Sequence, residues 1–68
     1  METFKLKGEF IQLNQLIKAM GWTENGAAAN NLIDAGQIKV NWAVEHRKRN
    51  KLVAGDTVSF KGKQVVIE

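Results

Sequence analysis

The chain of 68 residues contains no cysteine, no proline and a single histidine, His46. Without cysteine it can form neither disulfide bonds nor thiolate metal sites, and one histidine cannot build a zinc site without further ligands. No apolar run approaches the roughly 18 residues that a membrane-spanning helix requires, and the start of the chain lacks the apolar core of a signal peptide. We therefore expect a cytoplasmic protein with no metal, no cofactor and no contact with membranes.

The usual motifs of enzyme sites are missing as well. The sequence contains no glycine-rich phosphate loop and no Ser-His-Asp arrangement with a supporting spacing. A chain of this length also offers little enclosed volume from which water could be excluded during a reaction. We expect a single domain, residues 1–68, that binds a partner and is not an enzyme.

Positive charge, in contrast, is concentrated in one part of the chain. Residues 1–36 carry three cations against four carboxylates, a sum of −1, whereas residues 37–68 carry seven cations against three carboxylates, a sum of +4. The window 37–51 alone reaches +4, because five cations face the single Glu45 there. These cations are Lys39, Arg47, Lys48, Arg49 and Lys51. A phosphate backbone is the partner that such a cluster favours.

The first half of the chain predicts two short helices. Apolar residues recur at helical spacing over residues 13–20, and Gly21 can close that helix in the left-handed conformation. Trp22 follows this glycine, where a hydrophobic side chain commonly folds back onto the core. Asn25 is suited to cap a second helix, whose apolar spacing continues to a second closing glycine, Gly36.

The second half predicts short strands joined by tight turns. Apolar and polar residues alternate in the segments 38–40 and 57–60, and at the start of the chain in 3–6, while the largely apolar run 64–67 follows a turn. Turn signals lie at Asn41, at 54–56 and at 61–63. We expect an α+β fold in which two short helices pack on a small, mostly antiparallel sheet of about four to five strands.

The order of these pieces resembles the RNA-binding domain first recognised in the small-subunit ribosomal protein S-four. The resemblance covers roughly residues 11–60 and is carried by the stretches 13–22, 28–41 with its Gly-Gln-Ile-Lys-Val-Asn sequence, and 53–58 with its Gly-Asp turn. In these positions the chain is similar to the stand-alone bacterial members of the family, those of the YbcJ type. The resemblance implies the αL-motif fold and binding to structured RNA, typically ribosomal or transfer RNA, without catalysis.

Two features of the sequence depart from the family pattern. Where family members usually carry cations in the two helices, this chain has uncharged residues, among them Asn14 and Asn30, so the expected contact shifts to the basic window. Trp42 stands where the family commonly has glycine after the turn asparagine. Its indole could stack on an unpaired base, or could pack on the sheet or against the stems of Lys39 or Arg47.

The predicted contacts with RNA follow from the clustered charge and from the resemblance. They are Lys39, Arg47, Lys48, Arg49 and Lys51, with His46, Trp42, Asn41 and Asn30 as lesser contacts. The same charges could instead dock an acidic protein, for example on the ribosome or an assembly intermediate, or could simply keep a sheet edge solvated. Because the cations are clustered and not alternated with acids, the sequence favours RNA, bound by a monomer.

Overall fold

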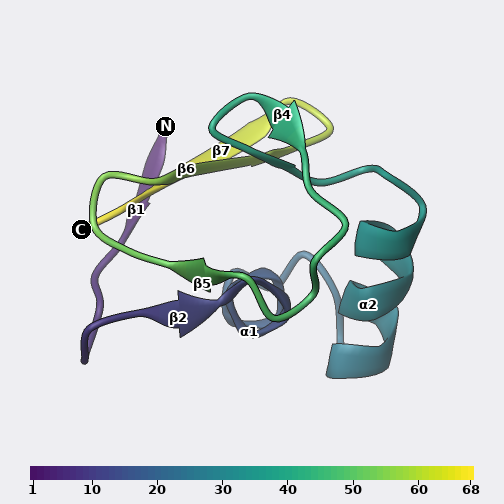
Figure 1. Ribbon diagram of the computed structural model, residues 1–68, viewed down its shortest axis with the longest axis horizontal. Helices are drawn as coiled ribbons and strands as arrows, with labels where there is room; N and C mark the ends of the chain where they lie inside the picture. The colour runs from purple at the N-terminus through teal and green to yellow at the C-terminus, as the bar shows by residue number, and fades with distance from the viewer.

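Two layers make up the fold, with a five-stranded sheet on one side and both helices on the other (Figure 1). The computed structural model describes all 68 residues. Its elements are β1 (Glu2–Phe4), β2 (Ile11–Gln12), α1 (Leu13–Ala19), α2 (Gly26–Asp34), β3 (Lys39–Val40), β4 (Ala43–Val44), β5 (Lys51–Leu52), β6 (Thr57–Phe60) and β7 (Lys63–Ile67). The short strands β2 and β5 form a separate ribbon on the helical side of the sheet (Figure 1).

Both helices form where the apolar spacing predicts them. The buried stripe of α1 consists of Leu13, Leu16 and Ile17, and the chain leaves this helix through Gly21 at φ 73°. The side chain of Asn25 caps α2 by accepting a 2.8 Å hydrogen bond from the backbone N–H of Ala28. The two predicted helices are therefore confirmed, with their ends set by the expected residues.

The sheet has the strand order β1-β7-β6-β3-β4. Its pairs are antiparallel except at one edge, where β1 runs parallel to β7. Two-residue turns join β3 to β4 and β6 to β7, and both residues of each turn have positive φ, as in type I′ hairpins. In the first turn these residues are Asn41 at φ 50° and Trp42 at φ 71°. For a tryptophan this conformation costs about 1–2 kcal/mol relative to the right-handed region.

The two faces of the sheet differ in chemistry. Lys39 pairs with Ser59, and Ser59 pairs with Gln64, so these three side chains share one face. Their sequence neighbours Val58 and Val65 are fully buried on the opposite face. We call the face of Lys39, Ser59 and Gln64 the outer face, and no helix covers it (Figure 1).

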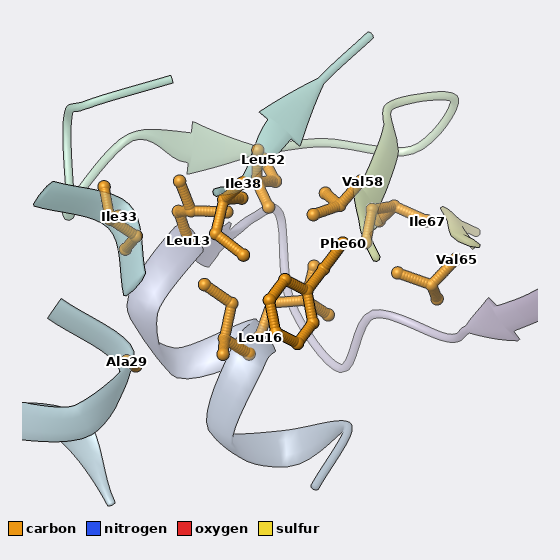
Figure 2. Packing of buried hydrophobic residues seen from close by; sticks show 11 residues of the cluster. Leu13, Leu16, Ala29, Ile33, Ile38, Leu52, Val58, Phe60, Val65 and Ile67 are labelled. Carbon is orange, nitrogen blue, oxygen red and sulfur yellow. The ribbon is translucent and has the colours of Figure 1, made fainter. Parts of the chain in front are cut away.

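A single cluster of buried side chains holds the layers together (Figure 2). Leu13 and Leu16 reach from α1 toward Phe60 and Ile38, while Ile33 closes the cluster from α2. All eleven members are apolar: Leu13, Leu16, Ile17, Ala29, Ile33, Ile38, Leu52, Val58, Phe60, Val65 and Ile67. Trp22 packs against this cluster with its ring centroid 5.8 Å from that of Phe60, as expected from its place after Gly21. The core therefore draws on both halves of the chain.

Three features of the sheet differ from the expectation or were not foreseen. The ribbon of β2 and β5 was not predicted, because strands of two residues are too short to show an alternating pattern. The first strand spans Glu2–Phe4 and not residues 3–6, so Leu6 lies beyond it. Its parallel partner β7 is more than sixty residues away along the chain, a distance over which local patterns carry no information about register.

The core predicts a difference between two valines that lie close together in the sequence. Val58→Ala removes two buried methyl groups and leaves a cavity, so it should lower the free energy of unfolding by about 2 kcal/mol. Val53→Ala at a side chain that is 47% exposed should change it by less than about 0.5 kcal/mol. Urea denaturation followed by circular dichroism measures both, and equal effects would contradict the assigned core.

Candidate nucleic-acid interface

The segment of residues 45–51, here called the basic loop, joins β4 to β5, includes the first residue of β5 and passes the start of α1 (Figure 1). The backbone N–H of Leu13 donates to the carbonyl of Asn50, and the N–H of Asn14 donates to the carbonyl of Lys48, each at 2.9 Å. The first amides of a helix have no partner within the helix, so these carbonyls satisfy two of them. The basic loop is thereby attached to α1 through its backbone.

Glu45 fixes the basic loop from within. Its carboxylate accepts a 3.1 Å hydrogen bond from the backbone N–H of Arg47 and a 3.0 Å hydrogen bond from Nδ2 of Asn50. It also binds the Arg47 guanidinium, with 2.9 Å between Oε1 and Nη2. Only 15% of the Glu45 side chain is exposed. The single carboxylate among the cations therefore positions the segment that carries them.

The tip of the basic loop is a turn that presents two cations. The N–H of Asn50 donates to the carbonyl of Arg47 at 3.2 Å, which places Lys48 and Arg49 at the central positions of a four-residue turn. Arg49 is exposed and forms no ion pair. Lys51 follows directly in β5, and its Nζ lies 4.9 Å from the centroid of the Phe10 ring. Four cations thus occur within five consecutive residues, 47–51, at one end of α1.

Two of the five predicted cations are not free of carboxylates. Arg47 pairs with Glu45, and Lys48 pairs with Asp34 at the end of α2, with 3.2 Å between Nζ and Oδ2. Arg49, Lys51 and Lys39 form no ion pair. Exposed pairs of this kind are worth about 1 kcal/mol or less. The Arg47 side chain remains 76% exposed, so its guanidinium keeps N–H groups that face water.

Lys39 and Trp42 lie away from the basic loop. Lys39 belongs to the outer face of the sheet, and Trp42, 60% exposed, belongs to the adjoining turn. Both line a hollow on that face to which no residue of the basic loop contributes. The five predicted cations therefore do not form one continuous patch. The structure brings Arg47, Lys48, Arg49 and Lys51 together and separates Lys39 from them.

The amide of Asn41 is engaged inside the protein. Its Nδ2 donates to Oδ1 of Asp56 at 3.1 Å, and its Oδ1 accepts from the N–H of Thr57 at 3.0 Å. The second carboxylate oxygen of Asp56 accepts from the N–H of Val53 at 2.9 Å. Asn41 therefore ties the β3–β4 turn to the turn before β6, in addition to supplying positive φ.

The remaining two predicted residues are His46 in the basic loop and Asn30 in α2. His46 is exposed, and its Cε1 lies 3.5 Å from the point where a side chain on Gly36 would begin. Oδ1 of Asn30 accepts a 3.2 Å hydrogen bond from Nδ2 of Asn14, which joins α2 to α1 in a part-buried contact. His46 thus lies at the end of α2 and Asn30 at the junction of the two helices.

Two residues that organise the site were missed in the sequence. Glu45 carries a signal, since it is the only acid among the five cations, but its hydrogen bonds to Arg47 and Asn50 depend on a turn that has no local sequence pattern. Asn50 carries no such sequence signal, because its carbonyl accepts the hydrogen bond from Leu13, which lies 37 residues earlier in the chain. Both position the cations and neither needs to contact a ligand.

The electrostatics of the basic loop center on the Glu45–Arg47 pair. The hydrogen bond from the Arg47 side chain holds the pKa of Glu45 below its ordinary value of 4.5, although partial burial acts in the opposite direction. The same contact raises the pKa of Arg47 further. The pair is thus ionised at neutral pH.

The chain has neither a metal-ligand cluster nor a membrane helix. No three side chains of histidine, cysteine, aspartate or glutamate lie close enough together to hold a metal ion. The longer helix, α2, has nine residues, whereas a helix needs about 20 apolar residues to cross a bilayer.

Comparison with known proteins places this geometry in a family. The family described as the S4 domain matches residues 4–68, and the chain belongs to this family. The family predicted from the sequence is thereby confirmed.

The relatives can be specified further. "Putative RNA-binding protein YbcJ" of Escherichia coli strain K12 is 52% identical over 68 residues, which is 98% of this chain and 97% of that protein. "Uncharacterized protein YbcJ" of Shigella flexneri has the same identity and coverage. The solution structure of YbcJ from E. coli matches with a TM-score of 0.73 and 51% identity, over 98% of this chain and 86% of that one. That structure is described as revealing an αL motif involved in RNA binding, and its likeness confirms the α+β fold.

The position of Glu45 predicts a pH-dependent contribution to stability. Because its pKa is lowered in the folded protein, the stabilisation is fully present above pH 4.5 and is lost as the pH falls through the folded value. Glu45→Gln should therefore lower the free energy of unfolding by about 1 kcal/mol at pH 7, and the difference from the unaltered protein should shrink toward pH 3. Denaturation at a series of pH values measures it.

Glu24→Gln is the matched control for this experiment. Glu24 is exposed and its carboxylate forms neither a hydrogen bond nor an ion pair, so the change should stay within about 0.5 kcal/mol at every pH. A Glu45→Gln difference that is the same at pH 7 and pH 3 would show that the carboxylate charge does not hold the basic loop.

Proposed function

We propose that this protein is a non-catalytic RNA-binding protein whose basic loop contacts the phosphate backbone of structured RNA. Ribosomal or transfer RNA in the cytoplasm is the expected target. The observation that carries the proposal is the attachment of the basic loop to α1, which holds four neighbouring cations at one place on a rigid support. Membership of the S4 domain family and the names of the YbcJ relatives support it.

The chemistry of the loop suits phosphate better than a single carboxylate ligand. Arg49 and Lys51 have no carboxylate partner, so they can neutralise phosphates without breaking a contact. Arg47 can keep its bond to Glu45 and still offer further N–H groups, because a guanidinium carries five donors. Lys48 would exchange a water-exposed bond to Asp34 for a phosphate, which costs little.

The other predicted residues have secondary roles in this proposal. His46 in the basic loop and Asn30 near its attachment to α1 would meet the edge of a bound RNA. Asn41 acts as a positioning residue, since both atoms of its amide are already hydrogen-bonded within the protein. The uncharged helical surface leaves the loop as the main source of affinity, so binding should depend on backbone charge more than on base sequence.

Salt dependence tests the proposal directly. If the four cations of residues 47–51 each neutralise one phosphate, the logarithm of the association constant should fall against the logarithm of salt concentration with a slope of about −3 to −4. Arg49→Ala combined with Lys51→Ala should reduce this slope by about 1.5 to 2 and weaken binding at least about tenfold. Fluorescence anisotropy with a labelled RNA stem-loop provides both numbers.

The control removes the same charge elsewhere. Lys7 and Lys18 are exposed and form no ion pair, and Lys18 lies at the opposite end of α1 from the basic loop. Lys7→Ala combined with Lys18→Ala should change the affinity by less than about twofold, since distant exposed charges are screened. If both double variants lose the same affinity, binding depends on the net charge of the protein and not on the basic loop. Tighter binding to an acidic polypeptide than to the stem-loop would favour protein docking.

A further inference from the structure

The outer face of the sheet holds a second site of a different kind. A hollow of about 340 Å³ opens there, and the residues that line it include Gln37, Lys39, Trp42, Ser59, Lys61 and Gln64. None of its lining residues is an acid, and two are lysines that form no ion pair. An open surface with two unpaired ammonium groups and no carboxylate attracts an anion.

Trp42 gives this hollow an aromatic wall. Its side chain is 60% exposed, so it contributes little to the core, yet it occupies a turn position with φ 71° that favours glycine. The Asn41 amide holds this turn in place by donating to Asp56 and accepting from the backbone N–H of Thr57. Neighbouring residues therefore hold Trp42 in an unfavourable backbone conformation and keep its large ring at the surface. Packing of the core does not explain a tryptophan at this position.

The polar groups around the ring match the parts of a nucleotide. Lys39 stands on β3, and Lys61 stands on the β6–β7 turn with its Nζ 5.4 Å from the centroid of the Phe60 ring. Two amide side chains, Gln37 and Gln64, offer both donors and acceptors at the same hollow. The aromatic face can stack on a base, and the two amides can hydrogen-bond to the edge of that base. The two cations can bind its phosphates.

We propose that this hollow binds an unpaired nucleotide of the RNA, with the base stacked on Trp42 and its phosphates at Lys39 and Lys61. The proposal rests on the proposed function and deepens it, because it assigns a stem to the basic loop and a flanking single strand to the outer face. A base inside a helix could not serve, since both of its faces are already stacked on neighbouring bases. RNA with an unpaired extension is thus the preferred substrate class.

The test compares RNAs that share one stem-loop. One is blunt-ended, and the others carry four unpaired nucleotides at the 5′ or the 3′ end. The unaltered protein should bind at least one extended RNA about tenfold more tightly than the blunt RNA, and Trp42→Gly should bind all of them with the affinity of the blunt RNA. Trp42→Phe should retain part of the gain, because phenylalanine also stacks.

Two lysine variants give a second readout. Lys61→Ala should reduce the salt slope by about 0.7 for the extended RNA and leave it unchanged for the blunt RNA. Lys63→Ala is the matched control, because Lys63 lies in the same hairpin but does not line the hollow. Folding is not at issue, since glycine at position 42 relieves the positive φ and should leave the thermal midpoint equal or higher.

The outcomes separate this inference from the proposed function. Two results overturn the nucleotide site and leave the basic loop as the RNA contact, provided that the blunt RNA shows salt-dependent binding. In the first, neither extension increases the affinity. In the second, an extension increases the affinity and Trp42→Gly keeps that increase. Absence of binding to every RNA overturns both. A gain that is lost in Trp42→Gly and reduced in Lys61→Ala, while Lys63→Ala binds normally, establishes the site.

Discussion

The contact between the basic loop and the first amides of α1 is the constraint on which the rest of the surface depends. A short helix exposes unpaired N–H groups at its start, and here two of them are satisfied by the carbonyls of Lys48 and Asn50. This arrangement removes a cost of forming α1 and, with the same two bonds, orders a segment that has no regular structure of its own. Glu45 completes it by binding Arg47 and Asn50. Stability and presentation of charge are therefore coupled.

The separation of the two charged regions follows from the β3–β4 hairpin. Lys39 and Arg47 are eight residues apart, but between them the chain reverses at Asn41 and Trp42 and leaves the sheet after Val44. Lys39 stays on the outer face, while the basic loop continues to α1. A compact run of positive charge in the sequence thus becomes two separate charged surfaces in the folded protein.

The sequence predicted those parts of the fold that rest on local chemistry. Helical spacing over Leu13–Met20, the cap at Asn25 and the turn at Asn41 all depend on neighbouring residues, and each is confirmed. Contacts between distant residues could not be predicted: the Lys48–Asp34 pair spans 14 residues, and the carbonyl of Asn50 reaches Leu13 across 37. The candidate cations were identified by clustering, but their division between two surfaces depends on where the hairpin turns. Local pattern identifies candidate residues, and tertiary structure decides which of them lie together.

The parallel pairing of β1 with β7 has a consequence for the order in which the chain folds. The first strand has its only partner in β7, and the N–H of Leu6 donates to the carbonyl of Glu68. The helices and the two hairpins join segments that are much closer along the chain, so they can form before this edge of the sheet. The β1–β7 edge should form late, since pairing between distant segments requires the larger loss of chain entropy. Until β7 is in place, β1 has no partner and Val58 lacks its neighbour Val65.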